Sequence, residues 1–233
     1  MRTHAPAWGV LVAAFSLILI VGLGAFGVGR IVDAWVGDLP DVHDPNAFTY
    51  SAKTRIYAND RTTLLAEFFL QDQEPIEKDQ VSDYVLQGTV ATEDARFYEH
   101  EGVDFYGIGR ALVNNMKGGS LEGASTITQQ LVRNTLLSSE ANDISFRRKV
   151  REAELAIEME QAYSKDDILL MYLNTINYGS GCYGIEAAAQ HYFSKSAIDL
   201  TIAEAATLVG IPQSPTYNNP INYPENCTKR RNV

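Results

Sequence analysis

The feature that most constrains this chain is an uncharged apolar stretch near its N-terminus. From Ala5 to Gly29 no residue carries a formal charge, and Leu, Ile, Val, Ala and Phe are frequent. About 20 such residues suffice for a helix to cross a membrane, whereas the apolar region of a cleaved signal peptide spans about 7–15 residues. The stretch is longer than that, and no convincing small-residue cleavage site follows it. We therefore expect a retained anchor, with a cleaved signal peptide as the alternative.

The charges on either side of this stretch predict its orientation. Arg2 and the α-amino group precede it, and several aspartates follow it. The positive-inside bias places the N-terminus in the cytoplasm and the chain after Arg30 outside it. We expect a cytoplasmic tip and transmembrane signal-anchor at residues 1–30, an acidic stalk at 31–53, and one extracytoplasmic domain at 54–233.

Composition limits the class of protein. The chain has 233 residues, of which 45% are hydrophobic and 21% charged, which suits an anchor plus one globular domain. A net charge of −10 argues against nucleic-acid binding through a basic surface. Cys182 and Cys227 fit neither a zinc cluster nor a disulfide-dense scaffold, and whether they form a bridge is left open.

The spacing of apolar residues predicts a mainly α-helical fold. Strand-like residues flank Asn59-Asp60 and indicate a small hairpin or edge strands at residues 54–69. Helical spacing predicts helices at residues 81–91, 106–115, 125–136, 144–163, 165–174, 185–193 and 202–209. Because no alternation of strands and helices is visible, a parallel α/β fold is not expected.

Two adjacent carboxylates, Glu93 and Asp94, follow the small and apolar residues that end the first predicted helix. A lone pair of this kind usually lies on the surface, but here the core meets a cleft. Partial burial raises the pKa of a carboxyl and makes it usable as a general base near neutral pH. His100 follows, and no partner histidine stands at a spacing that would support a metal site.

Two later segments could bind an anionic or sugar-containing substrate. Residues 125–130, Ser-Thr-Ile-Thr-Gln-Gln, form an uncharged polar run whose hydroxyls, amides and helix N–H groups could hold sugar hydroxyls or a phosphate. Arg148 and Lys149 can clamp phosphate oxygens, and Glu152 lies one turn from Arg148 on the same helix face. Taken alone, such a basic run is more often a solvated helix face.

Five motifs in this chain follow one another in the order of a known family. They are Glu93 to Gly102, Gly123 to Gln130, Arg148 to Glu152, Lys165 to Asn174, and Gly184 to Phe193. Together they resemble glycosyltransferase family 51, the peptidoglycan glycosyltransferase module of class A penicillin-binding proteins and their monofunctional relatives. The resemblance extends from about Thr54 to Val233, and residues 212–215 and 230–233 fit the end of the module.

The resemblance implies a fold and an activity. The fold would be a lysozyme-like helical domain with a small membrane-leaning lobe. The activity would be polymerisation of lipid II into β-1,4-linked glycan strands, with inversion and release of undecaprenyl pyrophosphate. Expected partners are lipid II, the growing strand, the membrane and other cell-wall synthesis proteins, at the bacterial cell (inner) membrane.

The resemblance also implies roles for individual residues. Glu93 matches the catalytic base that takes the proton of the acceptor 4-hydroxyl, and Glu152 matches a second catalytic acidic residue on the pyrophosphate side. Arg148 and Lys149 match residues that bind the donor pyrophosphate. The other implied substrate-binding residues are Asp94, His100, Ser125, Thr126, Gln129, Gln130 and Arg133. At position 133 the family often carries lysine, so a planar fork replaces a point charge.

The sequence leaves the need for a cofactor open, because arginine and lysine can neutralise a pyrophosphate without one. Mg²⁺ or Mn²⁺ at the pyrophosphate is the alternative. The sequence contains neither Ser-x-x-Lys nor Lys-Thr-Gly, the motifs of a penicillin-reactive transpeptidase. Because residues 54–80 resemble the bifunctional group, we expect the N-terminal part of a bifunctional protein.

Two other functions compete with this interpretation. A lysozyme-like glycan-cleaving enzyme can use a glutamate on the same kind of fold, but it needs neither a pyrophosphate clamp nor a lipid anchor. A non-catalytic cell-wall scaffold would leave both Glu93 and Glu152 dispensable.

Overall fold

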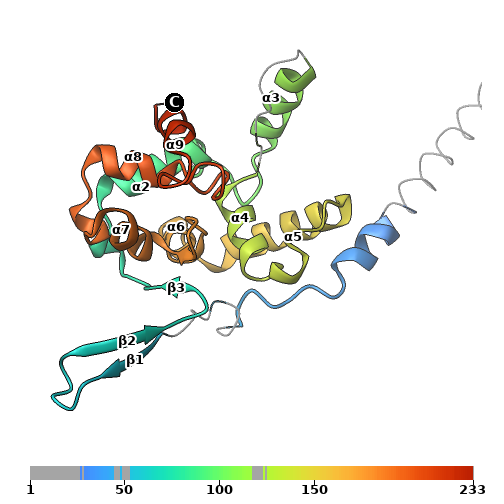
Figure 1. The fold of residues 1–233 in the computed structure, drawn as a ribbon. Coiled ribbons are helices and arrows are strands. Elements are labelled where there is room, and N and C mark those ends of the chain that lie inside the picture. Colours follow the sequence, from blue (N-terminus) through green and yellow to red (C-terminus); the bar gives the residue numbers. More distant parts are fainter. Residues whose placement is uncertain are drawn as a thin grey trace, which may run out of the picture.

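The computed structural model describes residues 27, 29–44, 48, 53–116, 123 and 125–232. Its named helices are α2 (Asp83–Glu93), α3 (Phe105–Met116), α4 (Ile127–Asn134), α5 (Phe146–Ala162), α6 (Lys165–Thr175), α7 (Ile185–Phe193), α8 (Ile202–Val209) and α9 (Pro224–Arg231). The strands are β1 (Thr54–Tyr57), β2 (Leu64–Phe68), β3 (Asp72–Gln73) and β4 (Cys182–Tyr183). The prediction of a mainly helical fold is confirmed (Figure 1).

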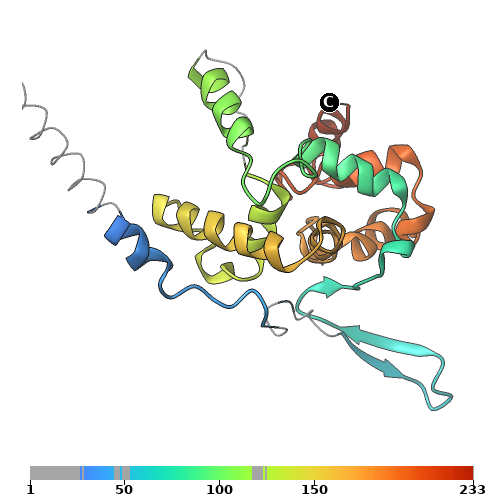
Figure 2. The ribbon, with the colours of Figure 1, turned by 180° about the vertical axis from the view of Figure 1, so that it is seen from behind.

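The predicted hairpin is present and projects from the helical body (Figures 1 and 2). β1 and β2 pair antiparallel, and the Asp60 carboxylate accepts hydrogen bonds from Thr62 and Thr63 in the turn. These bonds, from Thr63 above all, lower the pKa of Asp60 to about 2. Beyond the hairpin, β3 pairs in parallel with β4. This pairing connects the base of the hairpin to the segment before α7.

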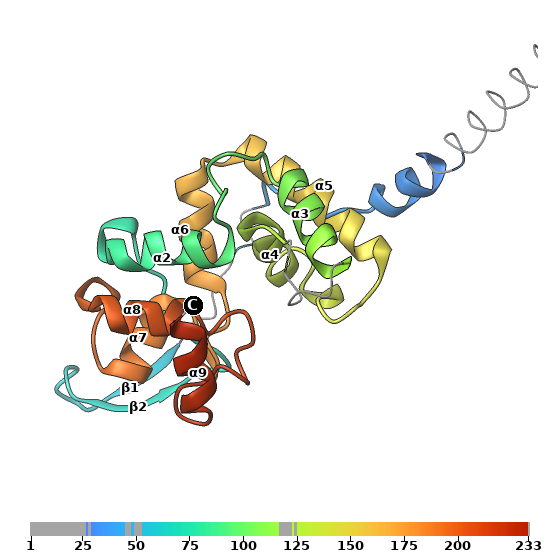
Figure 3. The same cartoon turned by 90° about the horizontal axis from the view of Figure 1, so that it is seen from above.

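The helices form two groups around a shared core. Seen from above, α2, α7, α8 and α9 lie together, α3, α4 and α5 lie on the other side, and α6 runs between them (Figure 3). α4 packs against α5 and α6, and α2 packs against α8. Leu131, Leu155 and Ile168 from the three central helices have no exposed surface. Burying each such side chain is worth roughly 1.5–3 kcal/mol, so this core fixes the position of α4.

Local capping explains where several helices begin. Capping boxes start α4 (Thr126 with Gln129), α6 (Ser164 with Asp167) and α8 (Thr201 with Glu204). Each box satisfies two backbone N–H donors that the first turn would leave unpaired. α4 therefore starts two residues later than predicted, because Thr126 is its cap.

A helical segment at residues 29–36 lies against α5, so the first part of the predicted acidic stalk is helical. Arg151 of α5 is buried, donates a hydrogen bond of 2.5 Å to the Trp35 carbonyl and forms an ion pair with Asp38. The rings of Trp35 and Phe146 meet edge to face at 6.2 Å. These contacts join the segment that follows the predicted anchor to α5, the helix that carries the basic cluster of Arg148 and Lys149.

The predicted membrane-spanning stretch at residues 5–29 lies almost entirely outside the described residues. Within the described part of the chain, every helix is too short or too polar to cross a bilayer.

α9 was not predicted from the apolar spacing, because its sequence is strongly polar. It begins with Pro224 at its first turn and ends with basic residues, both of which suit a helix. Cys227 on α9 and Cys182 on β4 are both buried and free, so the structure contains no bridge between them.

Candidate active site

Glu93 is the last residue of α2, and its side chain is 8% exposed. Its Oε2 accepts a hydrogen bond of 3.0 Å from Nε2 of Gln130 on α4, and the amide oxygen of Gln130 accepts one of 3.2 Å from the Tyr172 hydroxyl. Its other oxygen, Oε1, lies 3.7 Å from a guanidinium nitrogen of Arg230 and accepts no hydrogen bond from the described residues. One carboxylate oxygen is thus held by a hydrogen bond, while the lone pairs of the other remain available to accept a proton.

Burial raises the pKa of Glu93 above its usual value, as its place at the end of an apolar helix predicted. The hydrogen bond from Gln130 and the charges of Arg230 and Arg133 oppose this shift. The fully buried Tyr172 nearby has a pKa raised well above its ordinary value by its own burial. The raised pKa gives the Glu93 carboxylate a higher proton affinity, which is the property that a general base needs.

Asp94 and His100 are buried and bond to each other in the loop that follows Glu93. Asp94 accepts a 2.9 Å hydrogen bond from Nε2 of His100 and a 3.1 Å bond from the backbone N–H of Ile127, at the start of α4. Gly102 closes the loop at φ +88°, where an added Cβ would lie 2.6 Å from the backbone of Ala156. The loop is therefore pressed against α5, and α2 is locked to the start of α4.

The second half of the site lies on α5. Glu152 has no exposed surface; one of its oxygens pairs with Arg148 and the other accepts a 2.8 Å hydrogen bond from Lys149. Arg148 is also buried and donates to the Asp143 carbonyl. The predicted pairing of Arg148 with Glu152 is confirmed. Both carboxylate oxygens of Glu152 are thus engaged by its two cationic neighbours.

Lys149 is the more exposed of the two cations that pair with Glu152, since 41% of its side chain is exposed against 9% for Arg148. It donates a 3.0 Å hydrogen bond to the Ser125 hydroxyl, so the polar run before α4 meets the basic cluster. Partial burial, followed by the charges of Arg148 and Arg133, lowers the pKa of Lys149 to about 8, although the carboxylate of Glu152 favours the charged amine.

Arg133 on α4 connects the two halves electrostatically, because its charge acts on the pKa of both Glu93 and Lys149. Thr126 and Gln129 instead bond to each other in the capping box, and the Thr126 hydroxyl donates to the Gly102 carbonyl. The Thr126 hydroxyl and the Gln129 amide oxygen are therefore already used within the protein. A contact of these two side chains with substrate stays a prediction.

The structure thus brings together most of the site residues that the sequence predicted, around α4. Sequence reasoning gave no role to Arg230 or Tyr172, although both lie in segments that carried the family resemblance. Arg230 could not be assigned from spacing, since it is more than a hundred residues from Glu93. Their contacts with Glu93 and Gln130 depend on helix packing.

Comparison with known proteins decides the family. The family model described as transglycosylase matches residues 61–233, about three quarters of the chain. The chain belongs to this family. The glycosyltransferase resemblance of the five motifs and the prediction of an enzyme are thereby confirmed.

Relatives of this transglycosylase domain are penicillin-binding proteins. The chain is 42% identical to penicillin-binding protein 1A/1B of Bacillus subtilis (strain 168) over 94% of its own length and 24% of the relative. It is 40% identical to penicillin-binding protein 1A of Escherichia coli (strain K12) over 96% of its length and 26% of that protein. The chain therefore spans about a quarter of the length of these relatives.

Among solved structures, the crystal structure of penicillin-binding protein 1A from Haemophilus influenzae matches with a TM-score of 0.43 and 24% identity. The match covers 79% of this chain and 18% of that one.

Proposed function

We propose that this chain polymerises lipid II at the outer face of the cell membrane, with Glu93 as the general base. The single observation that carries the proposal is the state of Glu93: a buried carboxylate with one oxygen held by Gln130 and the other accepting no hydrogen bond from the described part of the chain. Oε1 takes the proton of the acceptor 4-hydroxyl as that oxygen attacks the donor anomeric carbon. A positioned base of this kind is worth roughly 10²–10⁴-fold in rate.

The leaving group needs positive charge more than it needs an acid. As the bond from the anomeric carbon to the pyrophosphate oxygen breaks, negative charge grows on the pyrophosphate, and direct displacement inverts the anomeric centre. Lys149, half exposed beside Ser125, supplies the cation that substrate can reach. Glu152, itself paired with Arg148, holds the Lys149 amine through a 2.8 Å hydrogen bond. Fixed charges of this kind stabilise the transition state without reorganisation.

The residues around the basic cluster do not fit a divalent cation held by the protein. Glu152 has both oxygens engaged by Arg148 and Lys149. Throughout the described residues, no group of three or more His, Cys, Asp or Glu side chains lies close enough together to hold a metal ion. The proposed neutralisation of the pyrophosphate therefore rests on this chain's own cations.

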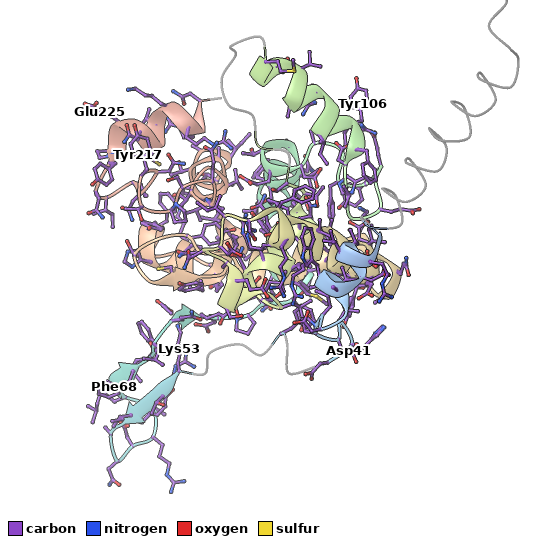
Figure 4. All side chains as sticks on the ribbon, turned by 90° about the vertical axis from the view of Figure 1, so that its right-hand side faces the viewer. Asp41, Lys53, Phe68, Tyr106, Tyr217 and Glu225 are labelled. Carbon is purple, nitrogen blue, oxygen red and sulfur yellow. The ribbon has the colours of Figure 1, made fainter. Side chains whose placement is uncertain are left out.

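A location at the membrane surface agrees with the exposed face of α3, which would be the membrane-leaning lobe of a lysozyme-like fold. Phe105, Tyr106 and Met116 are 76%, 69% and 79% exposed. Figure 4 shows Tyr106 at the outer surface of this helix. Exposed apolar patches of this kind mark interaction surfaces, and a lipid-linked substrate requires access to the bilayer. In the proposed topology, the N-terminus lies in the cytoplasm.

The proposal is tested by polymerisation of labelled lipid II with the detergent-solubilised chain and with Glu93→Gln. The matched control is Glu99→Gln, which changes an exposed glutamate in the loop after α2. We expect glycan polymer from the parent and the control, and at least a hundredfold lower rate from Glu93→Gln. Equal rates from Glu93→Gln and the parent would remove Glu93 from the chemistry. Digestion of purified peptidoglycan, with no polymer formed, would support the lysozyme-like alternative.

A further inference from the structure

The last described helix, α9, places a cation beside the proposed base. A guanidinium nitrogen of Arg230 lies 3.7 Å from Oε1 of Glu93. The Arg230 side chain is 20% exposed, and its Nε has no hydrogen-bond partner among the described residues. Its aliphatic stem runs beside Gly210 at the end of α8, where an added Cβ would approach the stem to 3.0 Å. α9 packs against α8, and α8 packs against α2. Arg230 is thus held at Glu93 by the packing of three helices.

The other groups near Glu93 act differently. Gln130 bonds to Oε2 and carries no charge. Arg133 acts through its charge from α4, and Asp94, as a like charge, raises the pKa of Glu93. The buried Tyr172 and Tyr178 are uncharged at neutral pH, since burial raises the pKa of both. Arg230 alone among these groups forms an ion pair with Oε1, the oxygen assigned to the proton.

We propose that Arg230 is a positioning residue for the transfer reaction, which keeps Glu93 ionised and aims its Oε1 at the acceptor hydroxyl. This inference rests on the proposed role of Glu93 as the base. The 3.7 Å separation suits the purpose, because an ion pair without a hydrogen bond favours the charged carboxylate yet leaves the lone pairs of Oε1 available.

The proposal predicts a change in pH dependence. Burial raises the pKa of Glu93, and the charge of Arg230 opposes that rise. Without this charge the pKa rises further, so the base is protonated over more of the pH range. The acid limb of the kcat profile should therefore move to higher pH by about one unit, since a nearby opposite charge shifts a carboxyl by roughly 1–3 units. At pH values below the acid limb, kcat would fall by up to about tenfold. At pH values well above the limb, kcat would change little.

The experiment measures kcat for lipid II polymerisation against pH at saturating substrate, using the full detergent-solubilised chain. Arg230→Gln removes the charge, and Arg230→Met does the same while keeping an apolar stem against Gly210. Arg230→Lys restores a cation. The control is Lys229→Gln, which removes an exposed cation from the preceding position of α9. Thermal unfolding is measured on every variant.

We expect the acid limb to move upward in both neutral variants, to return to within about 0.3 units of the parent in Arg230→Lys, and to stay in place in Lys229→Gln. An unmoved limb in a folded neutral variant would overturn the proposal, as would an equal shift in Lys229→Gln. Failure of both neutral variants to fold would also overturn it, by assigning Arg230 to the stability of α9. If instead Glu93→Gln stays active, the proposed base itself is wrong, whatever Arg230 does.

Discussion

Substitution of Glu152 by glutamine tests how much this buried carboxylate stabilises the folded protein. The side chain of Glu152 is fully buried, and its oxygens pair with Arg148, which is 9% exposed, and with Lys149, which is 41% exposed. Glutamine keeps the shape but removes the charge. Arg148 would then be a buried cation without a carboxylate, whereas Lys149 can turn toward solvent.

The expected loss of stability follows from the exposed fractions of these side chains. Removing one member of a buried ion pair costs about 3–5 kcal/mol, because the other charge stays buried and unpaired. The Asp143 carbonyl still accepts a hydrogen bond from Arg148, so the lower end, about 3 kcal/mol, applies. For a folded unit of this size each kcal/mol lowers the unfolding midpoint by about 2–4 °C, which gives a decrease of roughly 6–12 °C.

Thermal unfolding followed by circular dichroism measures this change. Glu154→Gln, two residues along α5 and exposed, is the matched control and should unfold within about 1 °C of the parent. The double variant Arg148→Met with Glu152→Leu should recover more than half of the lost stability, because an apolar pair can replace a buried ion pair. A midpoint for Glu152→Gln within about 2 °C of the parent would refute the idea that this carboxylate balances Arg148.

Two further predictions concern substrate binding. Lys149 has a pKa of about 8, so it loses its charge as the pH rises through that value, and the apparent KM for lipid II should increase severalfold between about pH 7 and pH 9. Lys149→Arg should abolish this increase, and an equal increase in the variant would contradict the assignment. Phe105→Ser combined with Tyr106→Ser should raise KM at least about threefold for lipid II in vesicles but not in detergent, because both exposed side chains would lose their contact with lipid. Equal effects in the two media would argue against a membrane-facing α3.

Much of the site could be predicted because its signals are local. The apolar end of the first predicted helix placed Glu93 at the edge of the core, and the structure confirms the burial and the raised pKa. The i, i+4 spacing of Arg148 and Glu152 placed them on one helix face, where they pair. Both inferences depend on residues within a few turns of one another. The helical periodicity is fixed by backbone geometry before any tertiary contact forms.

The sequence could not show which polar groups are used inside the protein. The substrate contact of Thr126 and Gln129 stays a prediction, but the Thr126 hydroxyl and the Gln129 amide oxygen already form hydrogen bonds at the start of α4. Asp94, expected beside the base in the cleft, instead bonds to His100 and to the start of α4. In each case a buried donor or acceptor had to find a partner, and the available partner was set by the packing of α2, α4 and α5.

By itself, then, the sequence determined the helical class of this protein, its family through five ordered motifs, and the local surroundings of Glu93 and Glu152. Only the tertiary structure decided that Glu152 is fully buried and that Arg230 of α9 lies at Glu93. Contacts between residues far apart in the chain depend on how whole helices bury their apolar faces. That packing is the sum of many small contributions from buried contacts. The sequence next to Glu152 or Arg230 therefore carries no pattern that would reveal it.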